Sequence, residues 1–139
     1  MIVLDTNVLS EPLKPVPDPA VLAWLDRQVR RDLFLTTISV AELLAGVAML
    51  PEGKRRSDLQ EAYTVEVFTQ FADRILAFDR AAAEALPGIT QRARAAGRPV
   101  SFADSLIGAI AVARGFKVAT RDASPFEAMG IEVINPWRS

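Results

Sequence analysis

The chain of 139 residues contains no histidine and no cysteine. These two absences exclude an imidazole base, a thiolate nucleophile, a disulfide bond and a zinc site built from the usual sulfur and nitrogen ligands. Any chemistry must therefore be carried by carboxylates. The lack of cysteine also agrees with a reducing compartment, and we expect a cytoplasmic protein.

Strong net charge and long apolar runs are missing as well. The 16 basic and 17 acidic residues give a net charge of −1, whereas proteins that hold nucleic acid through bulk charge are usually strongly basic. No apolar run is long enough to cross a bilayer, and the opening MIVLD lacks the basic region of a secretory signal. We therefore expect no membrane partner, and any contact with nucleic acid must depend on a local patch or on metal ions.

The composition does supply a core. Half of the residues are hydrophobic and 24% are charged, which is typical of a globular protein and not of a disordered one. No internal repeat, linker or low-complexity segment divides the chain. We therefore expect residues 1–139 to form a single domain.

Short apolar runs rich in β-branched residues alternate with segments of helical periodicity. This alternation predicts a layered α/β fold around a mostly parallel five-stranded sheet. The expected strands are residues 2–4, 33–38, 75–78, 117–120 and 131–134. The expected helices are residues 19–29, 40–50, 58–71, 80–96, 101–115 and 124–129, with Pro87 expected to kink or break the fourth of them.

Four acidic residues stand where a strand ends or a helix begins: Asp5, Glu42, Asp104 and Asp122. Because ligands bind at the carboxyl ends of parallel strands, we expect all four at one rim of the sheet. Two carboxylates about 4 Å apart repel by about 4 kcal/mol at an effective dielectric near 20, so such a cluster needs cations or must take up protons. Oxygen-only ligands favour Mg²⁺ or Mn²⁺, and one or two such ions would suit phosphodiester hydrolysis.

A structural interpretation competes with this one. Residues 39–42 and 101–104 both have the spacing of a capping box, in which Glu42 or Asp104 would bond back to the first residue of its helix. The other two acids could be ordinary turn residues. Asp79 occupies a similar place between a strand and a helix, and we expect it to be an N-cap.

Four motifs, in order and spacing, resemble those of PIN-domain ribonucleases, and most closely those of VapC-type bacterial toxins of the FitB-like branch. Each motif is weak alone, but together they span nearly the whole chain. They are Asp5–Leu9 (DTNVL), Ser39–Leu43 (SVAEL), Ser101–Ala109 (SFADSLIGA) and Thr120–Asp122 (TRD), with Asn135–Trp137 (NPW) near the end.

The resemblance implies a three-layer α/β/α PIN-like domain with a central, mostly parallel five-stranded sheet. It further implies a Mg²⁺- or Mn²⁺-dependent endoribonuclease that hydrolyses RNA phosphodiester bonds and forms a homodimer. Such a protein is the toxin of a type II toxin–antitoxin system. Its partner would be a small VapB/FitA-type antitoxin that blocks the acidic site and binds operator DNA, so that the toxin meets DNA only indirectly.

The same resemblance assigns the catalytic metal ligands to Asp5, Glu42 and Asp104, with Asp122 completing an acidic quartet. One position departs from the family pattern. Many relatives have Asn where Asp122 stands and Asp where Pro125 stands. Asp122 is therefore the ligand that the resemblance supports least, and it could reach the metal only through water or shape the substrate path instead.

Supporting roles fall to neighbours of these acids. Thr6 and Asn7 would position the first carboxylate or a metal-bound water, and Thr120 would support the same rim. Arg121 could hold a phosphate there, and an internal salt bridge is an equally good explanation for it.

Two other functions compete with this one. The chain could be a catalytically weak regulatory module that acts by binding its antitoxin and, through it, operator DNA. An aspartyl-phosphate enzyme built on Asp5 is disfavoured, because such enzymes carry a second acid two residues later, where this chain has Asn7.

Overall fold

The computed structural model describes residues 1–138. Its centre is a five-stranded sheet in the order β3-β2-β1-β4-β5. All four pairings are parallel, so every strand has its carboxyl end at the same edge. The strands are β1 (Ile2–Leu4), β2 (Leu33–Thr36), β3 (Ile75–Leu76), β4 (Lys117–Ala119) and β5 (Val133–Ile134).

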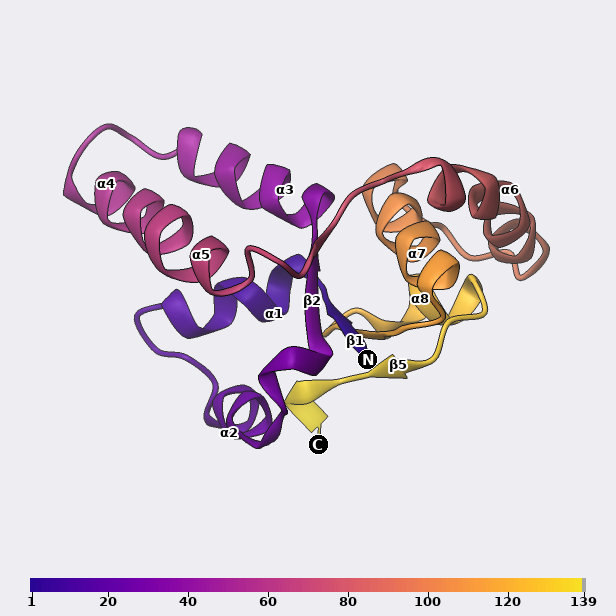
Figure 1. Cartoon of the computed structure of the whole chain (residues 1–139), viewed down its shortest axis with the longest axis horizontal. Helices are drawn as coiled ribbons and strands as arrows, with labels where there is room; N and C mark the ends of the chain where they lie inside the picture. The colour runs from indigo at the N-terminus through magenta and orange to yellow at the C-terminus, as the bar shows by residue number, and fades with distance from the viewer. Residues whose placement is uncertain (139) are drawn as a thin grey trace.

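Helices cover both faces of this sheet, as expected for an α/β/α domain (Figure 1). The helices from the first half of the chain lie on one side, and α6, α7 and α8 lie together on the other. The helical elements are α1 (Thr6–Ser10), η1 (Glu11–Leu13), α2 (Pro19–Arg27), η2 (Arg30–Asp32), α3 (Thr37–Ala48), α4 (Lys54–Glu61), η3 (Ala62–Val67), α5 (Phe68–Gln70), α6 (Arg80–Ala95), α7 (Phe102–Arg114), α8 (Ala123–Ala128) and η4 (Pro136–Arg138). No helix within residues 1–138 has both the length and the apolar character needed to cross a bilayer.

The core is divided by the alternation of side chains along the strands. Val3 and Val118 are fully buried in the cluster formed with α6, α7 and α8. Their neighbours Leu4 and Ala119 are buried in the opposite cluster, with residues of α1, α2 and α3. Both faces of the central strands are thus apolar, which is the pattern of a parallel sheet buried between two helical layers.

Two helix starts agree with the sequence prediction. Asp18 accepts a hydrogen bond from the backbone N–H two residues on, at 2.8 Å, and Pro19 is the first residue of α2. Asp79 accepts one from the N–H three residues on, at 3.0 Å, and caps α6. The helix α6 continues through Pro87, so a break at that proline does not occur.

The start of α3 differs from the prediction. Strand β2 ends at Thr36, and the Thr36 hydroxyl accepts a hydrogen bond from the Ser39 N–H at 3.1 Å, so that Thr36 is the N-cap. Ser39 therefore lies inside the first turn and is fully buried. Glu42 lies in the second turn, so the capping-box interpretation of residues 39–42 does not hold.

Other boundaries also differ. The short helix α1, directly after the first strand, has no counterpart among the expected helices. The expected helix at residues 58–71 begins earlier, at Lys54, because Gly53 takes a φ of 148° and turns the chain there. Its middle, residues 62–67, is a π-helix. The outer strands are shorter than expected, since pairing at the sheet edges covers only two residues in β3 and in β5.

Candidate active site

Asp5 is the most buried acid of the site. It leaves the end of β1 and caps α1, and the residue is 6% exposed. One carboxylate oxygen accepts a hydrogen bond from the Thr6 N–H at 2.8 Å. The other accepts from the Thr120 hydroxyl at 2.8 Å and from the Asn7 amide at 3.3 Å. The carboxylate is therefore fixed by two segments that are distant in the sequence, the start of α1 and the end of β4.

Thr6 connects Asp5 to the next acid. Its hydroxyl donates to Glu42 Oε1 at 2.7 Å and lies 3.0 Å from the buried Ser39 hydroxyl. One residue thus holds the Asp5 carboxylate with its backbone and the Glu42 carboxylate with its side chain. The early start of α3 makes this contact possible, because it places Glu42 in the second turn of the helix, where Glu42 meets α1.

The remaining two acids complete the rim. Asp104 lies in the first turn of α7, where its N–H donates to the Ser101 hydroxyl at 3.1 Å, so the predicted cap at Ser101 is confirmed. Asp122 occupies the position before α8 but makes no capping hydrogen bond with its side chain. Its N–H donates to the Thr120 hydroxyl at 3.1 Å. Helix capping therefore does not account for the Asp122 carboxylate.

All four acids line one open pocket of about 340 Å³, together with Thr6, Asn7 and Ser10. Asp5 is buried, Asp104 is half-buried, and Glu42 and Asp122 are exposed. The pocket therefore has a buried carboxylate and an exposed acidic rim. Topology brings together the residues that the sequence predicted. Ser10 joins them without a signal in the sequence, because the pattern of residues 6–10 does not predict α1.

Electrostatics show that the carboxylates interact. Burial, with a smaller contribution from the charges of Asp104 and Glu42, raises the pKa of Asp5 to about 6, although its hydrogen bonds lower the pKa. Burial also raises the pKa of Asp104 against a hydrogen bond from Ser101, and the charges of Glu42 and Asp122 act in the same direction as burial. Such a set favours the uptake of protons or cations.

The carboxylate oxygens of this pocket are chemically suited to a hard divalent cation. Within residues 1–138, no three acidic groups converge closely enough to hold an ion by themselves. Mg²⁺, however, keeps several water ligands and needs only one or two carboxylates directly. Carboxylate oxygens without histidine or cysteine are the ligands that Mg²⁺ and Mn²⁺ prefer.

Arg121 follows β4 and adjoins this pocket through its neighbour Asp122. No carboxylate within residues 1–138 forms an ion pair with Arg121. The internal salt bridge that the sequence offered as an alternative role for Arg121 is therefore not formed within these residues. Its guanidinium carbon lies 5.4 Å from the centre of the Trp137 ring. Trp137 is half-buried and packs against the cluster that contains Trp24 of α2.

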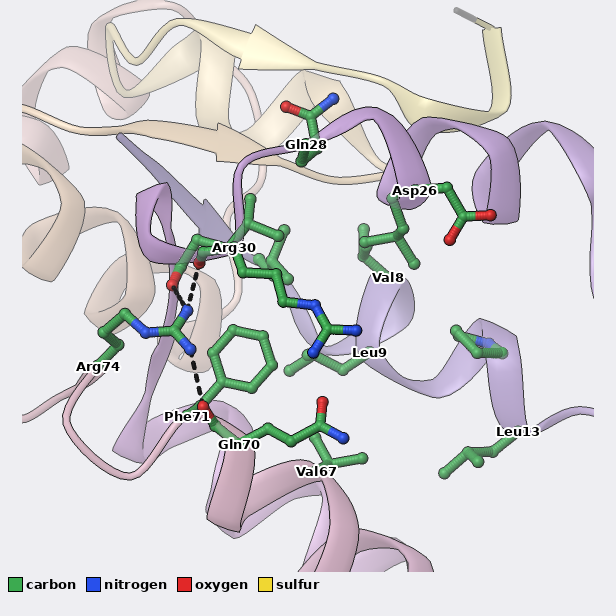
Figure 2. A pocket seen from close by; sticks show the side chains of 14 residues that line it. Val8, Leu9, Leu13, Asp26, Gln28, Arg30, Val67, Gln70, Phe71 and Arg74 are labelled. Carbon is green, nitrogen blue, oxygen red and sulfur yellow. Dashed lines mark hydrogen bonds between the residues drawn. The ribbon is translucent and has the colours of Figure 1, made fainter.

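The opposite side of α1 borders a different cavity. Val8 and Leu9 line an apolar groove of about 570 Å³ between α1, α2 and the η3–α5 segment (Figure 2). Arg74 closes one end, where it donates to the carbonyls of Leu33 at 2.8 Å and Gln70 at 2.7 Å. The helix α1 thus separates an apolar groove from the acidic pocket.

The fold and the site together define an α/β/α protein with an oxygen-only acidic pocket at the carboxyl edge of a parallel sheet. The model of the PIN domain family matches residues 2–132. The chain belongs to the PIN-domain family.

The chain is similar over its full length to individual members of this family. The chain is 50% identical to the VapC ribonuclease Y4jK of Sinorhizobium fredii, over 99% of this chain and 98% of that protein. It is 44% identical to the toxin FitB of Neisseria gonorrhoeae, over 99% of both. It also matches a chain in the solved structure of FitAB bound to a DNA fragment, with a TM-score of 0.94 and 43% identity over 99% of this chain and 96% of that one.

Proposed function

We propose that the protein is a Mg²⁺- or Mn²⁺-dependent endoribonuclease and the toxin component of a type II toxin–antitoxin system. One observation carries the proposal: four carboxylates from four separate parts of the chain line a single pocket in a protein without histidine or cysteine. The names of the two full-length relatives, a VapC ribonuclease and a toxin, support the same reaction and the same biological role.

The acids divide by position. Asp5, Glu42 and Asp104 would hold the metal, directly or through water, and Asp122 would complete the acidic rim. When bound, the ion would supply positive charge to the phosphoryl oxygens and lower the pKa of a water molecule. The exposed side of the pocket, at Glu42 and Asp122, is where an RNA phosphodiester would enter.

The surrounding residues keep these carboxylates in place before the substrate arrives. Thr120 and Asn7 fix one oxygen of Asp5, and Thr6 fixes the other while it also holds Glu42. Each of these hydrogen bonds restricts the side-chain conformations of the acids in advance, so less conformational entropy is lost when a metal ion or RNA binds. The pocket is therefore preorganised on its buried side and, through Glu42, at part of its rim.

Two observations support an antitoxin as the partner of this chain: its relatives and the apolar groove beside α1. The solved FitAB structure includes DNA, which supports a VapB/FitA-type antitoxin as the partner of this chain and contact with DNA only through that antitoxin. The apolar groove beside α1 would give the antitoxin a surface next to the acidic pocket. We further propose a cytoplasmic homodimer without a membrane partner.

The decisive experiment is cleavage of single-stranded RNA by the purified chain with Mg²⁺ or Mn²⁺. Asp5→Asn and Asp104→Asn should each lose activity about 100-fold or more, since each removes a carboxylate next to the reacting phosphate. EDTA should abolish cleavage. The matched control is Asp79→Asn, which makes the same change at an acid that lies outside the pocket, and Asn caps helices as well as Asp does.

Equal activity in all the variants, or cleavage that survives EDTA, would refute the metal-dependent mechanism. A chain that binds its antitoxin tightly but never cleaves RNA would favour the alternative, a catalytically weak regulatory module acting through its antitoxin on operator DNA.

A further inference from the structure

The backbone of Arg121 is anchored on both sides by asparagine side chains. Its N–H donates to Asn7 Oδ1 at 3.3 Å, and its carbonyl accepts from Asn135 Nδ2 at 3.4 Å. The same Asn7 side chain donates to Asp5 at 3.3 Å. Arg121 therefore has a defined position relative to the most buried acid of the pocket.

The second anchor also places an aromatic ring. The Asn135 side chain that donates to the Arg121 carbonyl accepts the Trp137 backbone N–H at 3.0 Å. The intervening Pro136 is buried and restricts the backbone between them. As a result, the Trp137 ring lies 5.4 Å from the Arg121 guanidinium carbon, within the range of a cation–π contact.

The charge of Arg121 is available to an external anion. The nearby buried acid Glu11 already forms an ion pair with Lys14 at 2.7 Å, and Arg121 is the weakest of the influences that lower the pKa of Glu11. Arg121 itself is exposed. A guanidinium that stacks on a ring keeps its N–H edge free for two parallel hydrogen bonds to a phosphate.

An acidic pocket repels RNA, and the net charge of −1 provides no general attraction. We propose that Arg121 binds an RNA phosphate adjacent to the acidic pocket, and that Asn135 and Trp137 are positioning residues that aim its guanidinium. This inference rests on the ribonuclease activity proposed above. It gives the Asn135–Trp137 segment, which contains no acid and does not line the pocket, a place in substrate binding.

The first test is the kinetics of RNA cleavage with Mn²⁺ for Arg121→Gln. We expect KM to rise about tenfold with kcat nearly unchanged, because one charge-assisted contact to the substrate is lost. The slope of log KM against log salt should fall by about 0.7, the value for one phosphate contact on a single strand. The matched control is Arg114→Gln, at the exposed C-terminal end of α7, which should change neither quantity.

The second test separates positioning from packing at Trp137. Trp137→Leu keeps an apolar side chain but removes the ring, and it should raise KM severalfold, whereas Trp137→Phe should stay close to the wild type. In the Arg121→Gln background, Trp137→Leu should have no further effect on KM, because the two residues act through one contact. Asn135→Ala should reproduce part of the Trp137→Leu effect.

Several outcomes would overturn the inference. An unchanged KM and salt slope in Arg121→Gln would do so while leaving the ribonuclease function intact, since the wild type would still cleave. Equal effects of Trp137→Leu in both backgrounds would show that the ring only packs. Weaker antitoxin binding with unchanged RNA kinetics would assign Arg121 to the antitoxin. A wild type that neither binds nor cleaves RNA would refute the proposed function and this inference together.

Discussion

Asp5 is kept in an environment that favours its neutral form. Burial raises its pKa from 3.8 to about 6, in spite of the hydrogen bonds from Thr120 and Thr6. A group whose pKa is raised on folding stabilises the fold fully only below its unfolded pKa, and this contribution is lost as the pH rises through the folded pKa. At neutral pH the ionised Asp5 therefore costs about 3 kcal/mol of folding stability. In the proposed function this cost has a use, because an ionised carboxylate is the form that a divalent cation binds.

We therefore predict that Asp5→Asn stabilises the metal-free protein near pH 7.5 while it abolishes activity. The gain should be at most about 3 kcal/mol, because the Asn side chain keeps one acceptor oxygen where the carboxylate uses two. The difference in the free energy of unfolding should shrink as the pH falls from 7 to 4. Urea denaturation in EDTA across this range measures it. A difference that does not vary with pH would contradict the assignment, and Asp79→Asn serves as the control.

At the scale of elements, the start of α3 controls where Glu42 lies. Thr36 is fully buried, and its hydroxyl satisfies the Ser39 N–H at the beginning of the helix. With Ser39 as the cap, Glu42 would take the capping-box position and bond back to Ser39 instead of accepting from Thr6. The Thr36 cap is thus both a stabilising contact and the feature that aligns one acid with the other three.

Thr36→Val tests the cap. It removes the acceptor for the Ser39 N–H at almost constant volume, and we predict a loss of about 1 kcal/mol in the free energy of unfolding, or about 3 °C in Tm. Thr64→Val makes the same change at an exposed hydroxyl within a helix and should cost much less. Thermal denaturation of both variants measures the difference. Equal losses would show that the Thr36 cap contributes nothing particular to α3.

At the scale of the whole molecule, four acids gather at one edge of a protein whose net charge is only −1. Burial and, after it, their mutual repulsion raise the pKa values of Asp5 and Asp104. A ligand that binds only the folded state stabilises it by an amount that grows with ligand concentration. A divalent cation should therefore stabilise the entire fold through this one pocket.

We predict that Mn²⁺ at about 100 times its Kd raises the free energy of unfolding by about 2.7 kcal/mol, or Tm by about 9 °C. Asp5→Asn and Asp104→Asn should respond much less, because each lacks one of the proposed ligands. Differential scanning fluorimetry with and without Mn²⁺, at constant ionic strength set with KCl, measures the shift. The same Tm shift in wild type and in both variants would place the ion elsewhere.

Much of the fold follows from local patterns. The apolar runs that end at Asp5 and before Asp122 predict strands, and Asp18 and Asp79 mark helix starts through their own side chains. These features depend on neighbours in the sequence, so the sequence is sufficient to predict them. The acids at the strand ends could be placed at one rim for a related reason, because parallel strands share a carboxyl edge.

Other features depend on contacts between distant segments. Thr36 and Ser39 are both reasonable N-caps by residue type. In the structure Thr36 is the cap, and Ser39 is buried beside Thr6. The cation–π contact of Arg121 with Trp137 joins two segments that the pairing of β4 with β5 brings together. No local pattern contains this information.

The sequence alone limits the chemistry that the pocket can support, since a chain without histidine or cysteine leaves only carboxylates as ligands for a hard cation. It also determined the order of the main elements, because periodicity and capping are local. The way in which the acids are held, and the basic side chain that lies beside them, became apparent only from the assembled fold. This is because hydrogen bonds such as that from Thr120 to Asp5, which spans 115 residues, form only once the sheet has assembled.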